Sequence, residues 1–264
     1  MSGYILCQTK KADKPFFVES INTNIYSLEE LCYFLYHNLY LVDASIINET
    51  LCTWISEELD LPRLAAKLRP HLGKFASAED VLYPVFKEIN YLTYEEMKGF
   101  NSRLAALGKE RLAVRMKRKG DALTENGMYV NAIQVYQKLL ERNDLDEQRK
   151  GFKASVRYNL GCAYSYLFQM EKAEECFLEA YREEHSRKTL KAYIIAYSSV
   201  HDKTDYDKIM DGLEADEESK KDIKEEIRQS LEAFESVTEK NIDEQNLDAL
   251  LEKLMKEYHR STGS

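Results

Sequence analysis

The chain of 264 residues is long enough for one large domain or two smaller ones. It contains 44% hydrophobic and 31% charged residues but only four prolines and ten glycines, a composition typical of long helices joined by short turns. The net charge of −9 argues against nucleic-acid binding, which needs clustered cations. The one basic cluster, at residues 111–119, is interpreted as a solvated helix face.

Cysteine usage and hydropathy indicate a soluble chain in a reducing compartment. The five cysteines are odd in number and scattered, so we expect free thiols and not a disulfide framework. We find neither a signal peptide nor an uninterrupted apolar run of about 18 residues. The sequence therefore predicts a cytoplasmic protein without a membrane span.

The first 26 residues read as non-helical. Two short apolar runs, Tyr4–Cys7 and Phe16–Val18, predict a small β-hairpin or two edge strands. Helices follow, beginning at the capping box formed by Ser27 and Glu30. Further helices are predicted over residues 44–58, from Pro62 in a first turn, and after two cap signals, Ser77 with Asp80 and Thr93 with Glu96. We expect residues 1–105 to form a helical N-terminal domain, which resembles no known family.

A repeated pattern begins near Ala113. Residues 158–164 combine Tyr158, Leu160, Gly161 and Tyr164, and Ala173, Phe177 and Ala180 follow. An approximate copy upstream keeps Gly120, Leu123, Gly127, Ala132 and Tyr136. Small residues at such spacings let two helices approach closely while large ones fill the seam, so each copy predicts a packed helical hairpin.

These residues resemble the tetratricopeptide repeat, a helix–turn–helix unit of about 34 residues. The resemblance implies units over 113–146 and 154–187 and a degenerate unit over 188–213, together a repeat domain at 106–213. A capping box at Asp144 and Glu147 predicts that the second unit begins early, near Leu145. Residues 214–264 are expected to be acidic capping helices with a short tail. The predicted fold class is thus all-α, a helical N-terminal domain followed by antiparallel helix pairs.

The concave groove of such an array is the candidate site. The resemblance implies that its first helices line the groove, here with Lys117, Asp121, Tyr158, Asn159, Cys162 and Tyr166. Some family members clamp a peptide carboxylate with five residues. Lys117 and Asn159 match two of those positions, Asp121 would repel the ligand, and Thr189 and Tyr193 stand where cations should be.

The sequence contains no phosphate-binding glycine loop, nucleophile elbow or histidine pair at metal-ligand spacing. We therefore predict a non-enzymatic interaction module, an adaptor or scaffold that binds a peptide segment or protein, with no cofactor, metal, nucleic acid or membrane among its partners. One alternative is a peptide-responsive transcriptional regulator, although residues 1–110 carry 11 cations against 15 carboxylates. Another is an enzyme with an unrecognised N-terminal domain. The oligomeric state stays open.

Overall fold

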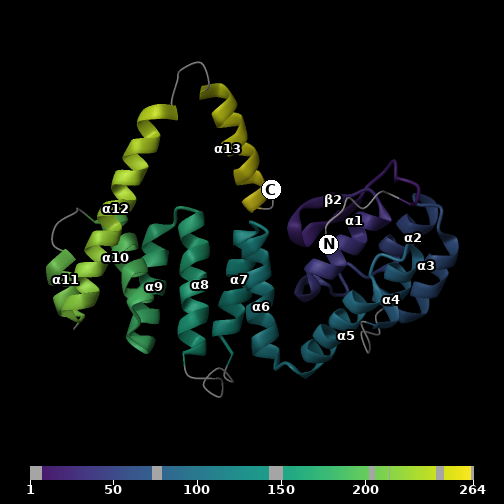
Figure 1. The fold of residues 1–264 in the computed structure, drawn as a ribbon, viewed down its shortest axis with the longest axis horizontal. Helices are drawn as coiled ribbons and strands as arrows, with labels where there is room; N and C mark the ends of the chain where they lie inside the picture. The colour runs from purple at the N-terminus through teal and green to yellow at the C-terminus, as the bar shows by residue number, and fades with distance from the viewer. Residues whose placement is uncertain are drawn as a thin grey trace. The chain divides into compact units, whose positions relative to one another are not determined.

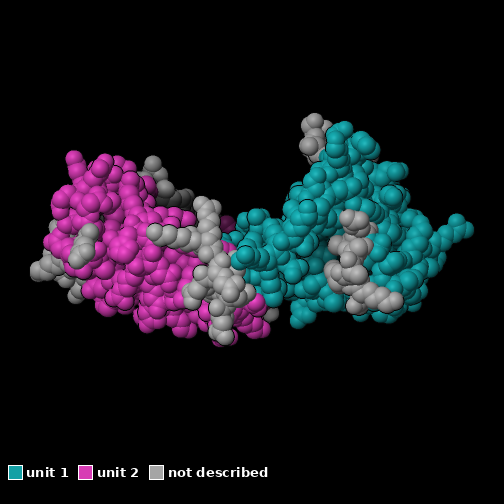
Figure 2. Space-filling view, turned by 90° about the horizontal axis from the view of Figure 1, so that it is seen from below, with its two compact units in different colours: residues 1–126 teal, residues 127–264 magenta. Residues whose placement is uncertain are grey.

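A computed structural model describes residues 8–72, 79–142, 151–201, 206–213, 215–241 and 247–262. The chain divides into two compact units, unit 1 over residues 1–126 and unit 2 over residues 127–264, which Figure 2 distinguishes by colour. Helices make up most of both units, and the strands in the described ranges are two short ones (Figure 1). The predicted all-α fold class is confirmed, while the domain boundaries expected near residues 105 and 213 stay predictions.

Unit 1 begins with a small antiparallel hairpin. Strand β1 (Phe16–Val18) pairs with β2 (Thr23–Ile25), and Phe16 lies opposite Ile25. The connecting turn ends at Asn22, whose φ of 46° places it in the left-handed region that asparagine tolerates better than most residues. The predicted strand at Phe16–Val18 is therefore present, with Thr23–Ile25 as its partner; the other expected strand, Tyr4–Cys7, lies outside the described residues.

Helices and single turns complete unit 1. They are α1 (Leu28–His37), the 3-10 turn η2 (Leu39–Leu41), α2 (Glu49–Glu57), α3 (Pro62–Leu68), the 3-10 turn η3 (Arg69–His71), α4 (Glu79–Glu88), α5 (Tyr94–Lys109) and α6 (Leu112–Glu125). Their core is rich in aromatic rings. Phe86 meets Phe100 edge to face with centroids 5.1 Å apart, and Tyr36 stacks on Phe100 at 5.7 Å.

Side-chain caps set several of these helix starts. The Ser27 hydroxyl accepts from the Glu30 amide at 3.2 Å, and Thr93 with Glu96 forms a complete capping box. Pro62 occupies the first turn of α3, as predicted. Helix α2 begins later than the predicted residue 44, because Asn48 caps it by accepting from the Leu51 amide at 3.0 Å.

Unit 2 is a row of antiparallel helices. It comprises α7 (Tyr129–Leu140), α8 (Phe152–Tyr166), α9 (Met170–Glu184), α10 (Arg187–Val200), α11 (Tyr206–Gly212), α12 (Glu217–Asn241) and α13 (Leu247–Thr262). Helices α7 to α10 pack side by side in chain order (Figure 1). The predicted early start near Leu145 lies outside the described residues; the described part of α8 begins after Gly151, which has a φ of 79°.

The tightest fit in unit 2 joins α8 to α9. A Cβ atom added at Gly161 would lie 2.6 Å from Cε1 of Phe177, so only glycine leaves room for this ring. Ala173 and Ala180 of α9 are fully buried. Arg157 reaches across from α8 to the carboxylates of Glu179 and Glu183. The predicted hairpin of small and large residues is therefore present.

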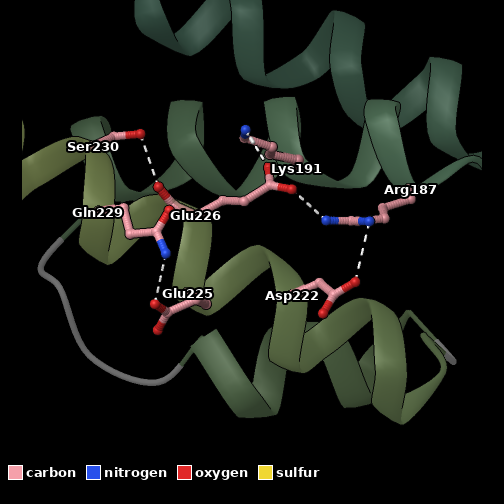
Figure 3. Close-up of polar contacts among 7 residues, drawn as sticks. All are labelled: Arg187, Lys191, Asp222, Glu225, Glu226, Gln229 and Ser230. Atoms are coloured by element: carbon pink, nitrogen blue, oxygen red, sulfur yellow. Dashed lines mark hydrogen bonds and ion pairs between the residues drawn. The ribbon is translucent and has the colours of Figure 1, made fainter.

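Charged side chains join α10 to α12 (Figure 3). Arg187 pairs with Asp222 at 3.1 Å and also with Glu226, which Lys191 contacts as well. Ile223 is fully buried beside these ion pairs. Within the described ranges, none of the helices is long and apolar enough to cross a bilayer.

Candidate functional site

Four of the six predicted groove residues lie on α8. Tyr158, Cys162 and Tyr166 are four residues apart and so follow one face of the helix, with Asn159 beside Tyr158. Lys117 and Asp121 lie on α6 in unit 1, where their side chains pair with each other at 2.9 Å. The charge of Lys117 is therefore already paired with Asp121 inside the chain, whereas a lysine that clamps a carboxylate presents its charge to the ligand.

Tyr158 has a cation directly over its ring. The ammonium of Lys188, in the first turn of α10, lies 4.0 Å from the ring centroid, a cation–π distance. The same ring also packs against Phe177, with centroids 5.4 Å apart. We call Tyr158, Asn159, Cys162 and Lys188 the Tyr158 face. It combines an aromatic surface and an amide from α8 with an exposed cation from α10.

Burial governs the acid–base chemistry of this face. It raises the pKa of Tyr158 to about 12, with the neighbouring Cys162 as a smaller cause. It also raises the pKa of the Cys162 thiol, against the opposing effects of the Tyr158 hydrogen bond and the Lys188 charge. Both groups are therefore neutral at pH 7. They can offer hydrogen bonds to a ligand, but neither is prepared to act as a nucleophile or general base.

The other described cysteines are free thiols with the same tendency. Burial is the first cause that raises the pKa of Cys32, Cys52 and Cys176, the last to about 12. No group of three potential metal ligands gathers anywhere in the described part of the chain.

Tyr166 belongs to a different neighbourhood from Tyr158. Its ring is 61% exposed and stacks flat on Tyr129 of α7, with centroids 4.4 Å apart. Burial raises the pKa of Tyr129. The Arg260 guanidinium, which lies near Gly127 from the last turn of α13, opposes this rise. Tyr166, at the end of α8, thus contacts α7, while Tyr158, in the middle of α8, contacts Lys188 of α10.

Lys188 was not among the groove residues predicted from the sequence. The repeat pattern assigned Thr189 and Tyr193 to the third unit, but both are buried, with 2% and 6% of their surface exposed. The side chain that reaches Tyr158 belongs to the preceding residue. The sequence signal that could have identified Lys188 is the helix cap at Ser186. Its hydroxyl accepts a hydrogen bond from the Thr189 amide, which fixes where α10 begins and therefore which side chains of its first turn are exposed.

Unit 1 contains an open depression of about 500 Å³, lined by Lys67, His71, Asp80, Tyr83, Pro84, Lys87 and Glu88. His71 and Asp80 approach to 3.6 Å there, and both side chains are well exposed to solvent. Solvated pairs of this kind are common on protein surfaces and contribute little energy. The described residues that line the depression leave it open to solvent.

A segment of unit 2 is similar to a known protein family. Residues 154–184 match the family model described as the tetratricopeptide repeat. No curated protein and no solved structure matches the chain. The matched segment contains nearly all of α8 and α9, including Gly161, Phe177 and Arg157. Over the α8–α9 hairpin, the chain is therefore similar to a tetratricopeptide repeat, the family that its residue pattern predicted.

Proposed function

We propose that this protein is a non-enzymatic interaction module that binds a peptide segment of another protein through the Tyr158 face. Tetratricopeptide repeats generally mediate contacts between proteins, and the first helix of each repeat supplies the ligand-facing side chains. Here α8 and α10 hold these positions. The observation that carries the proposal is the exposed Lys188 ammonium over the Tyr158 ring, 4.0 Å from its centroid.

The chemistry of the Tyr158 face favours an extended or helical segment held by polar and aromatic contacts. Asn159 offers both donors and acceptors, and the Tyr158 hydroxyl stays protonated at pH 7 because burial raises its pKa to about 12. Lys188 adds one positive charge that an acceptor or carboxylate of the ligand can approach. We propose that the predicted residues Tyr166, Lys117 and Asp121 contribute less, since Tyr129 and the Lys117–Asp121 pairing already engage them.

A displayed peptide library selected on the full chain would test this proposal. Enriched peptides would be titrated against the unmodified chain and against Lys188→Glu. We expect at least tenfold weaker binding, about 1.4 kcal/mol, because the variant places a carboxylate over the Tyr158 ring. Tyr158→Phe keeps the ring against Phe177 and tests the hydroxyl alone.

Lys172→Glu is the matched control. Lys172 also lies over a tyrosine ring, 5.4 Å from the centroid of Tyr164, but it belongs to α9. Both variants change the net charge by the same amount. Peptides that bind both variants as well as the unmodified chain, or a selection that enriches none, would contradict the proposal.

A further inference from the structure

Helix α13 exposes a row of apolar side chains. Leu250, Leu251, Leu254, Met255 and Tyr258 are 39%, 48%, 51%, 60% and 62% exposed, respectively. Their spacing of three and four residues places them on one stripe of the helix. An apolar stripe on the surface of a soluble chain commonly marks a binding surface.

Arg260, in the last turn of α13, is the side chain that approaches the start of α7. Its guanidinium comes within 3.6 Å of the Cβ position of Gly127, two residues before α7 begins, and its charge acts on Tyr129, the first residue of α7. At about 100° per residue, Arg260 lies roughly 200° around the helix from Tyr258. Arg260 therefore reaches this neighbourhood from the polar side of α13, while Leu250, Leu251, Leu254 and Met255 stay exposed.

Polar and charged residues flank this stripe in a self-complementary order. One flank carries Asp248, Glu252 and His259, and the other carries Lys253 and Glu257. In an antiparallel pair of identical helices, equal flanks meet about a two-fold axis near Leu254. Asp248 then faces the second copy's His259, and Lys253 faces the second copy's Glu257. A parallel pair would join opposite flanks and bring Glu252 against Glu257.

We infer that α13 pairs antiparallel with α13 of a second copy of this chain, with the apolar stripe as its seam and Lys253 and Glu257 setting its direction. Such an interface is isologous, because each helix offers the other the same surface. A helix of 16 residues is about 24 Å long. A pair of helices of this length buries less than the roughly 1,600 Å² of a standard stable interface, so we expect the dimer to be weak and its population to depend on protein concentration.

Analytical ultracentrifugation of the full chain up to about 200 μM tests the pairing, a range suited to micromolar dissociation constants. We expect the unmodified chain to shift from monomer to dimer and Leu254→Lys to weaken the dimer at least tenfold. Phe168→Lys is the control, because Phe168 is an apolar residue of unit 2, 86% exposed, outside α13. A chain that stays monomeric, or a dimer that tolerates Leu254→Lys, would overturn the inference.

A charge-swap mixture tests the direction. Lys253→Glu alone and Glu257→Lys alone each place like charges across an antiparallel seam, so each is expected to be monomeric. Their equimolar mixture restores attraction at both positions and is expected to dimerise. Circular dichroism checks that all forms keep equal helix content. A mixture that associates no better than its separate components would overturn the antiparallel arrangement.

Discussion

Two junctions of unit 2 differ in what chiefly holds them. The α8–α9 hairpin depends mainly on shape, because the Phe177 ring occupies the space that a side chain at position 161 would need, although Arg157 also pairs with Glu179 and Glu183 across it. The α10–α12 junction depends on charge, because half-exposed Arg187 and Lys191 reach Asp222 and Glu226 (Figure 3). Close packing responds little to salt or pH. Exposed ion pairs weaken when salt is added, because it screens the charges, and when the pH falls low enough to protonate the carboxylates. The hairpin should therefore be the more permanent of the two junctions.

The strongest way to break this contrast is Gly161→Ala. The new methyl group would approach the Phe177 ring, which also packs against Tyr158, so we expect α8–α9 to lose about 2 kcal/mol of stability. Hydrogen exchange of the two helices, read by mass spectrometry, would measure the loss as faster opening.

The same substitution at Gly99 is the control. Gly99 lies within α5, and a Cβ atom there meets nothing within 4 Å. Gly99→Ala should therefore stabilise its helix by about 0.5–1 kcal/mol. Destabilisation of similar size at both positions would show that steric fit at Phe177 is not the cause.

A smaller effect is expected at the link between the hairpin and α10. His185 ends α9 with a φ of 52°, a left-handed conformation that glycine adopts without cost. We expect His185→Gly to stabilise unit 2 by about 0.5–1 kcal/mol, measured by thermal unfolding. Gln169→Gly is the comparison, because Gln169 has an ordinary φ of −87° and should gain nothing. Equal responses would contradict the proposed backbone cause.

The charged junction should respond to the loss of one carboxylate. Glu226→Gln removes the partner shared by Arg187 and Lys191, so we expect hydrogen exchange in residues 217–230 to rise a few-fold. About 0.5 M salt should produce a similar change through screening. Glu225→Gln is the matched control, since Glu225 pairs with Arg228 and Gln229 on its own helix. Equal effects of the two variants would place the stabilisation within α12 instead.

The smallest expected effect at the α10–α12 junction is a change in the pKa of Glu226. The hydrogen bond from Lys191 is the largest cause that lowers the Glu226 pKa below its usual value of 4.5, and Arg187 adds to it. A lowered folded-state pKa stabilises the junction above pH 4.5 and ceases to do so as pH falls through the folded value. Carbon NMR of Lys191→Gln should show this pKa rising towards 4.5. An unchanged pKa would remove Lys191 from the junction.

The sequence predicted the hairpin well because its information is local. Gly161, Ala173, Phe177 and Ala180 form a pattern that one pair of helices explains by itself, and the structure buries all four. Capping residues such as Ser27 and Thr93 were equally readable, since each acts within its own first turn.

The missed features depend on contacts between distant residues. The pattern could not show that Thr23–Ile25 pairs with β1, because these residues alternate too weakly to stand out as a strand. It could not bring Lys188 to Tyr158, because a shift of one residue in the start of α10 decides which side chain is exposed. Of the Tyr158 face, the sequence predicted the α8 residues Tyr158, Asn159 and Cys162, whereas Lys188 was found only from the packing of α10 in the structure.

The buried thiols have a practical consequence for experiments on this chain. Reaction with maleimides, or with another disulfide, proceeds through the thiolate, which is scarce at pH 7 when a thiol pKa is raised. Cys32, Cys52, Cys162 and Cys176 all have raised values. With Cys7 replaced, a single cysteine introduced on an exposed face would therefore react far ahead of them, and the chain could carry a site-specific fluorophore with its native interior unchanged.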